Sequence, residues 1–186
     1  MQVNKFTFKK VLISKHKFWS YKNVLAYIVG NEEKIIARIE VNSTFTAKID
    51  YESRIYNVRA LTRLFAINKL EVFSSENVKI GEIDYWRWNG KPSISIHDTH
   101  GNETWEFDKN IPPLFSNRKN IYSTFLKDGN SKIFYEIEKG KFFKGGNGND
   151  CLREVNGIVH FPGRFGLIAV LGIYINELLI FEEMTK

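Results

Sequence analysis

The chain has 186 residues, of which 43% are hydrophobic, 26% charged and 15% aromatic. This length and composition predict one globular domain and exclude a disordered or low-complexity chain. The net charge is +6, and the lone cysteine, Cys151, excludes an intramolecular disulfide. A lone cysteine favours a reducing compartment, so we expect a cytoplasmic protein, peripheral at a membrane if it binds lipid.

Short β-strands separated by turns are predicted along most of the chain. Lys5 to Lys9 alternates apolar and polar residues, and Gly30-Asn31, Asn89-Gly90 and 128–130 are typical turns. The segment 61–67 fits either a strand or a short helix. The predicted strands, in chain order, are 5–13, 24–29, 34–41, 44–51, 54–60, 69–73, 79–86, 93–97, 103–107, 122–126, 132–138, 152–155 and 158–161. Their spacing indicates an antiparallel sandwich or barrel, because no helical pattern alternates with them.

The last predicted element is a helix that is apolar on every side. Residues 165–181 read FGLIAVLGIYINELLIF, which as a helix spans about 25 Å. A membrane anchor is disfavoured, because a bilayer needs about 20 apolar residues and a buried Glu177 would be costly. Enclosure by the strands is favoured. The Asn176-Glu177 end would then reach the barrel mouth, where water or a basic residue satisfies it.

We therefore expect a single domain over 1–186 that is mainly β. Its predicted architecture is an antiparallel closed β-barrel of about 12 strands that encloses a hydrophobic C-terminal α-helix over 164–183.

This order of elements, strands from Lys5 to Phe161 and then the apolar terminal run, resembles the tubby-like fold. That group includes the tubby C-terminal domain, the plant LURP-one-related proteins and the phospholipid scramblases. The resemblance implies a 12-stranded barrel around a hydrophobic C-terminal helix, and an association with membrane lipid. No binding residue is carried over. The basic headgroup motif of tubby domains does not align here, and one cysteine cannot supply the cysteine-rich stretch of scramblases.

The positive charge is concentrated at the N-terminal end. Residues 1–22 contain six lysines and no acidic residue, whereas the remaining 21 basic and 21 acidic residues balance. Such a cluster attracts lipid headgroups, nucleic acid or acidic protein. The alternative is that these are solvated lysines that protect a sheet edge. The candidate residues for an anionic surface are Lys5, Lys9, Lys10, Lys15, Lys17, Lys22 and Trp19.

Four motifs were weighed for chemistry, and none predicts a metal, a cofactor or a catalytic group. His97 and His100 fall in a turn without an obvious third ligand, and 145–150 matches neither a phosphate loop nor a calcium loop. Cys151 with His160 has no nucleophile signature. The paired Glu136 and Glu138 are typical of the solvent side of an alternating strand.

The sequence thus predicts a non-enzymatic binding protein that associates with anionic membrane lipid through its N-terminal region. The alternative is a protein-interaction or regulatory module with no lipid or nucleic-acid role. Nucleic acid is a weaker candidate than a membrane surface as the partner of Phe18, Trp19 and Tyr21, which lie among lysines. An enzyme with scattered site residues is a third class, and carriage of a ligand inside the barrel is disfavoured because the helix fills it.

Overall fold

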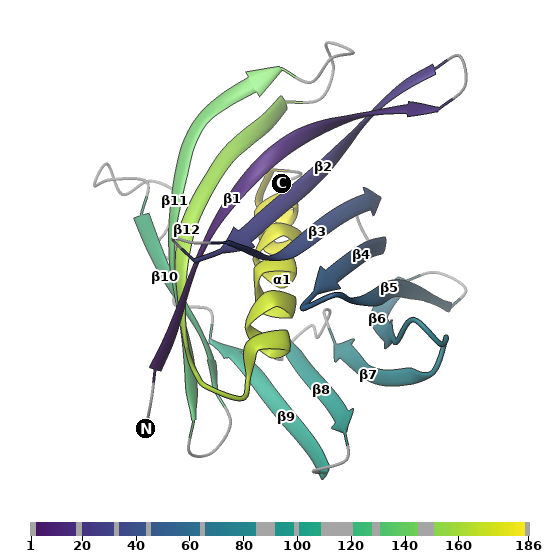
Figure 1. The fold of residues 1–186 in the computed structure, drawn as a ribbon, viewed down its shortest axis with the longest axis vertical. Coiled ribbons are helices and arrows are strands. Elements are labelled where there is room, and N and C mark those ends of the chain that lie inside the picture. Colours follow the sequence, from purple (N-terminus) through teal and green to yellow (C-terminus); the bar gives the residue numbers. More distant parts are fainter. Residues whose placement is uncertain are drawn as a thin grey trace.

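Figure 1 shows the computed structural model of the chain, in which a curved sheet surrounds a single helix. The described residues are 3–17, 20–31, 34–43, 46–63, 66–84, 92–98, 101–108, 121–127, 131–144 and 151–184.

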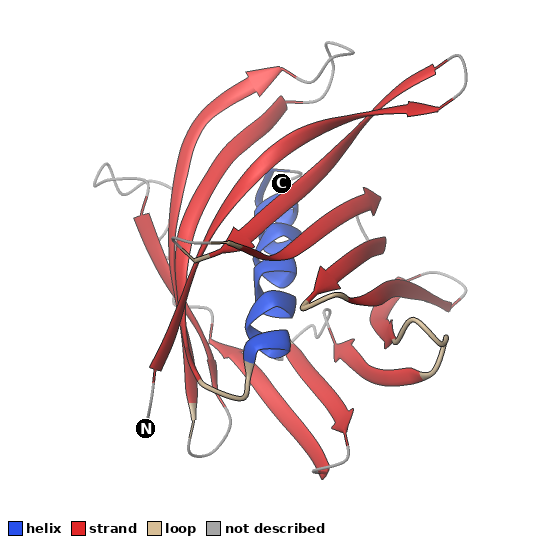
Figure 2. Ribbon diagram, viewed as in Figure 1, coloured by secondary structure: helices blue, strands red, loops and turns tan. Residues whose placement is uncertain are grey.

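Twelve strands and one helix make up this described part of the chain. In order they are β1 (Val3–Lys17), β2 (Ser20–Gly30), β3 (Ile35–Ser43), β4 (Thr46–Tyr51), β5 (Arg54–Arg63), β6 (Ala66–Phe73), β7 (Lys79–Asp84), β8 (Ser93–Asp98), β9 (Gly101–Asp108), β10 (Ile121–Lys127), β11 (Lys132–Lys144), β12 (Cys151–Pro162) and α1 (Gly166–Met184). Figure 2 separates the strands from the helix by colour. The predicted mainly β class with one C-terminal helix is confirmed.

Every strand pairs antiparallel with its neighbours in sequence, and β1 also pairs with β12. The hydrogen-bonded order therefore runs β1-β12-β11-β10-β9-β8-β7-β6-β5-β4-β3-β2, and β2 pairs with β1. The β9–β10 seam is the shortest among the described pairings, with three residue pairs, Phe125 to Asp108 through Lys127 to Glu106.

The boundaries of several predicted elements change in the structure. The ambiguous segment 61–67 divides between the end of β5 and the start of β6. The predicted break between 152–155 and 158–161 is wrong, because β12 runs through it as one strand. Asn156-Gly157 has a turn-like composition, but Gly157 lies opposite Phe8. A Cβ at this position would overlap the Phe8 ring, so the glycine serves close packing here.

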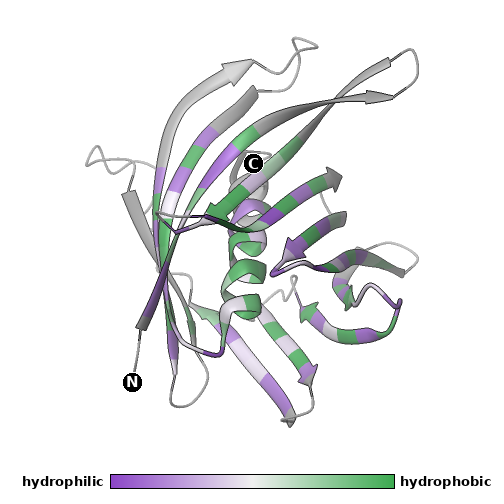
Figure 3. Cartoon of the chain, in the orientation of Figure 1, coloured by the Kyte–Doolittle hydropathy of each residue, from purple (hydrophilic) through white to green (hydrophobic). Residues whose placement is uncertain are grey.

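The helix fills the inside of the sheet. Among its described positions, Ala169, Val170, Leu171, Tyr174 and Ile175 are fully buried. Inward strand side chains from all around the sheet pack with the helix into one core, as Phe107, Tyr135 and Val159 show. Figure 3 shows the strands alternating between hydrophobic and hydrophilic residues, as expected when one face packs on a core. A helix wrapped in this way can be apolar on every side.

Gly172 brings the helix close to the wall. A Cβ at Gly172 would overlap the hydroxyl of Tyr135. Tyr135 uses the space to donate a hydrogen bond of 3.0 Å to the backbone carbonyl of Ala169. The wall therefore contacts the helix backbone directly at this point.

Candidate functional site

The lysines of β1 point to two different sides of the sheet. Phe6 and Phe8 are buried, whereas Lys5 and Lys9 are exposed. Lys10 is 5% exposed and belongs to the inward series of Phe6 and Phe8. Because side chains alternate along a strand, adjacent lysines at 9 and 10 must face opposite ways. Lys10 is therefore not part of an exposed basic cluster, which corrects its assignment to an anionic surface.

Lys10 instead forms a buried ion pair with the helix. Its Nζ lies 2.8 Å from Oε1 and 3.0 Å from Oε2 of Glu177, which is 7% exposed. The Tyr27 hydroxyl of β2 also donates to Glu177, and Lys10 Nζ lies 6.0 Å from the centre of the Tyr27 ring. Water or a basic residue was expected to satisfy the Asn176-Glu177 end of the helix, and for Glu177 the structure supplies a basic residue, Lys10.

The neighbouring polar residue of the helix is satisfied locally. Asn176 is 3% exposed, and its Nδ2 donates a 2.9 Å hydrogen bond to the carbonyl of Gly172. The polar cluster of Lys10, Tyr27 and Glu177 thus has internal partners. Fully paired clusters of this kind are typical of structural contacts in a core.

The other residues of the basic candidate set belong to the far part of the β1–β2 hairpin. Lys15 and Lys22 are register partners in the β1–β2 hairpin, and Lys17 ends β1. Their side chains and all of Trp19 lie outside the described residues.

A pocket opens at the end of the sheet where the helix begins. It has a volume of about 770 Å³ and is lined by the start of β1, the β2–β3 and β4–β5 turns, and the end of β12. Pairing of β1 with β2 starts at Thr7 and Gly30, so Asn4 to Phe6 pair only with β12. Because β2 ends early, a gap remains between the start of β1 and strand β3. We call this feature the rim pocket.

Basic and acidic side chains both line the rim pocket. The basic ones are Lys5, Lys34 and Arg38, and the acidic ones are Asp50 and Glu52. Arg38 Nη2 lies 3.2 Å from Glu40 Oε1, while its Nε is buried with no hydrogen-bond partner among the residues that the structure describes. Lys34 and Arg38 were not candidates from the sequence. The signal that could have found Lys34 is its place beside the predicted Gly30-Asn31 turn.

The β4–β5 turn at the rim pocket has an unusual backbone. Glu52 and Ser53 have φ angles of 49° and 64°, a left-handed conformation that normally favours glycine or asparagine. The Glu52 amide donates a 3.1 Å hydrogen bond to the carbonyl of Ile36. Burial, with a smaller contribution from Glu52, raises the pKa of the Tyr51 phenol well above its usual range.

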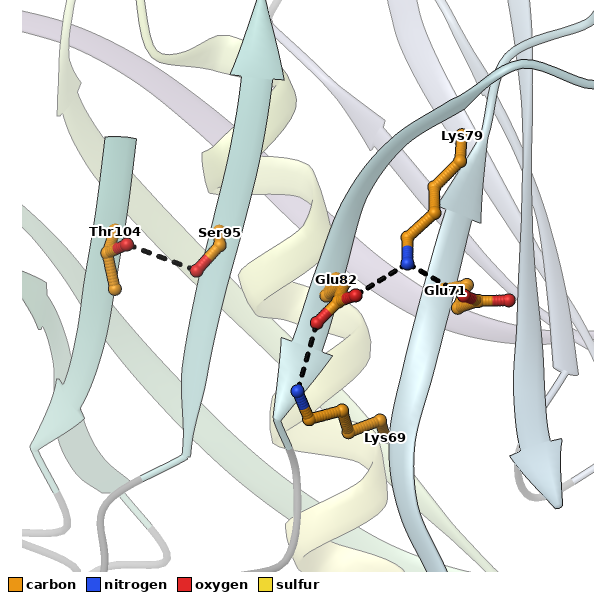
Figure 4. A network of polar contacts seen from close by, with 6 residues as sticks. All are labelled: Lys69, Glu71, Lys79, Glu82, Ser95 and Thr104. Carbon is orange, nitrogen blue, oxygen red and sulfur yellow. Dashed lines mark hydrogen bonds and ion pairs between the residues drawn. The ribbon is translucent and has the colours of Figure 1, made fainter. Parts of the chain in front are cut away.

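Four charged residues on the outer face of β6 and β7 form ion pairs with one another. Figure 4 shows Lys79 between Glu71 and Glu82, at 2.7 and 2.5 Å, and Lys69 at 3.2 Å from Glu82. Hydrogen bonds from Lys79 and Lys69 lower the pKa of Glu82, and those to Glu71 and Glu82 raise the pKa of Lys79. Exposed pairs like these contribute about 0–1 kcal/mol each. They leave little net charge for a partner.

The motifs weighed for catalysis do not form a site in the described part of the chain. Cys151 and His160 lie nine residues apart on the single strand β12, about 30 Å at the rise of a strand. Glu136 and Glu138 are both exposed, as predicted for the solvent side of β11. His97 Nδ1 is 2.7 Å from Asn102 Oδ1, within the β8–β9 hairpin. His100 and 145–150 lie outside the described residues.

Among the residues with defined positions, no three His, Cys, Asp or Glu side chains gather as metal ligands would. No helix in this described part of the chain has the length and apolarity required to cross a bilayer. No protein family, curated protein or solved structure matches this chain.

Proposed function

We propose that this chain is a non-enzymatic binding protein that associates with anionic membrane lipid through the outer face of β1. The observation that carries the proposal is the outward placement of Lys5 and Lys9 on β1. Lys5 also lines the same pocket as Lys34 of the β2–β3 turn. These exposed cations belong to a chain whose whole net charge lies within residues 1–22.

The location of the helix supports binding on the outside of the sheet. The described helix positions from Ile168 to Leu178 are buried, and they pack with the inward strand residues. Where the structure describes both helix and strands, their side chains fill the interior and leave no room for a lipid between them. A membrane would therefore contact the outer face of the sheet and its rim.

The expected strength of this contact is modest. Each lysine close to an anionic membrane surface contributes about 1 kcal/mol. Lys5 and Lys9 together would strengthen binding by roughly 30-fold at low salt, and the attraction falls within a Debye length of about 10 Å at 0.1 M salt. Binding should therefore be reversible and sensitive to salt.

The test is co-sedimentation with phosphatidylcholine vesicles that contain or lack phosphatidylglycerol. The double variant Lys5→Gln with Lys9→Gln should sediment much less with the anionic vesicles than the unchanged protein. A control with the same net charge is Lys48→Gln with Arg54→Gln, which neutralises two exposed residues of β4 and β5. An equal loss of vesicle binding in both double variants would rule out a site on β1, and so would sedimentation that does not depend on phosphatidylglycerol.

We also propose that the chain is similar to tubby-like proteins and that its sheet forms a closed barrel. Its proposed location is cytoplasmic and peripheral at a membrane. Pairing of β1 on both sides and the buried helix support the barrel. The second candidate function is a protein-interaction module. It predicts that partner capture survives the Lys5→Gln and Lys9→Gln changes that abolish vesicle binding.

A further inference from the structure

We propose that the rim pocket binds a single phosphate group, of the kind carried by a phosphodiester lipid headgroup. The inference deepens the proposed function and rests on it for the source of the phosphate. The same chemistry would accept a soluble phosphate monoester, so the experiment below includes both sources.

The first step is the position of the pocket. It lies where β1 extends past the end of β2, and its lining includes Lys5 of β1, Lys34 just before β3 and Arg38 within β3. These three cations come from β1, from the β2–β3 turn and from β3. Their convergence on one gap is a product of the strand register, and a group placed there could contact all three.

The second step is the state of Arg38. Its Nη2 is taken by Glu40 at 3.2 Å, but the buried Nε has no acceptor among the described residues. Buried donors are nearly always paired, and the described residues offer this one no acceptor. An oxygen of a bound phosphate would supply it, in a charge-assisted hydrogen bond of the kind that suits guanidinium groups.

The third step is the presence of acidic residues, which limits the ligand. Asp50 is the register partner of Arg38 across β3 and β4, and Glu52 interacts with the Tyr51 hydroxyl. Both carboxylates line the same pocket. Three cations and two carboxylates leave one net positive charge, which the single negative charge of one phosphate diester would balance. A polyphosphorylated ligand would place its further phosphates against Asp50 and Glu52, where like charges repel.

The fourth step concerns the source of the phosphate. Ile35 is 67% exposed, follows Lys34 and lines the pocket. It is one of two large hydrophobic side chains that are strongly exposed in the described part of the chain, the other being Val78. An exposed isoleucine beside lysines fits the membrane interface, where apolar side chains enter the acyl boundary and lysines remain among headgroups. This favours a lipid headgroup over a free metabolite.

The experiment is a backbone amide NMR titration with glycerol 3-phosphate, repeated with inositol hexakisphosphate. Glycerol 3-phosphate should give saturable shifts at residues around the pocket, with half-saturation in roughly the millimolar range. Arg38→Gln and Lys34→Gln should each weaken this binding about tenfold. Lys48→Gln, an exposed lysine away from the pocket, should leave it unchanged. Lys34 lies in an exposed turn, so its variant keeps the test valid if Arg38→Gln unfolds.

The outcomes separate this inference from the proposed function. Lys9→Gln should weaken sedimentation with phosphatidylglycerol vesicles without changing the glycerol 3-phosphate titration, because Lys9 does not line the pocket. Vesicle binding without any phosphate shifts at the pocket would refute the pocket and spare the proposed function. Phosphate shifts without vesicle binding would refute the lipid source. Tighter binding of inositol hexakisphosphate at the pocket would overturn the limit to one phosphate.

Discussion

Replacing Lys10 with methionine should strongly destabilise the fold. Methionine keeps the length and apolar stem of lysine but removes the ammonium group. In the folded protein that ammonium lies 2.8 and 3.0 Å from the two carboxylate oxygens of Glu177. The variant would leave Glu177 as a buried carboxylate whose remaining described partner is the Tyr27 hydroxyl.

The size of the effect follows from the burial of both partners. Lys10 is 5% exposed and Glu177 is 7% exposed, so solvent screens the pair little. Removing one member of a buried pair costs about 3–5 kcal/mol, because the other charge is left uncompensated. Domains of this kind are stable by about 5–15 kcal/mol, so the loss is a large share of the total.

A second variant tests whether the cost comes from the stranded charge. Lys10→Met combined with Glu177→Leu removes both charges and keeps the core volume similar, so it should recover most of the loss. Loss of the hydrogen bond between the Tyr27 hydroxyl and Glu177 would still cost about 1–3 kcal/mol. Lys9→Met is the matched control, because Lys9 is exposed on the same strand, and it should change stability by no more than about 0.5 kcal/mol.

The measurement is urea unfolding followed by circular dichroism, with midpoints compared at a constant slope. Equal midpoints for Lys10→Met and Lys9→Met would refute the burial of the ion pair. A double variant that is no more stable than Lys10→Met alone would show that the cost does not come from the stranded Glu177 charge, against the reasoning above.

Three further predictions follow from contacts of the wall and helix. Gly172→Ala should lower the melting temperature, since a Cβ overlapping the Tyr135 hydroxyl costs about 1–3 kcal/mol against a gain of up to about 1 kcal/mol in helix propensity; Tyr135→Phe in the same chain should restore part of the loss. Burial raises the pKa of Tyr135 and Tyr51, so above about pH 10 the unfolded chain releases protons that the folded chain retains. Unfolding free energy should then fall as pH rises, and a flat alkaline profile would contradict this. Hydrogen bonds from Lys79 and Lys69 lower the pKa of Glu82 from its usual value of 4.5. The pairing of Glu82 with these lysines therefore stabilises the fold at a pH above this usual pKa. The stabilisation is lost as the pH falls through the lower pKa that Glu82 has in the folded protein. Glu82→Gln should therefore cost less than about 1 kcal/mol at neutral pH and nothing in acid, as pH-dependent unfolding can show.

Much of the strand series was predictable because its signals are local. The alternation of Lys5 to Lys9 and the Gly30-Asn31 turn depend on residues close together in the chain, and β1 and β2 form where they predict. The break predicted at Asn156-Gly157 was wrong for a non-local reason. Whether such a pair turns or continues as a strand depends on the partner across the ladder, and here Phe8 fills the space above the glycine.

The candidate site was predictable only in part. Alternation along the strand places Lys10 on the same inward face as Phe6 and Phe8. The sequence could therefore have shown that Lys10 does not belong to the exposed basic surface. It could not have shown the rim pocket, because this pocket depends on where β2 stops relative to β1. Arg38 and Glu52 reach the pocket through pairing of β3 with β4 and through a turn with positive φ angles.

The amino-acid sequence by itself determined that the chain is mainly β and that its apolar C-terminal segment is a helix. Alternation and apolar runs set these features, and both act between near neighbours. Only the tertiary structure decided which lysine meets Glu177, 167 positions away along the chain, and which cations gather at the rim. Those contacts depend on strand register, which shifts whole sets of side chains between the core and the solvent and is fixed when all the strands pack around the helix.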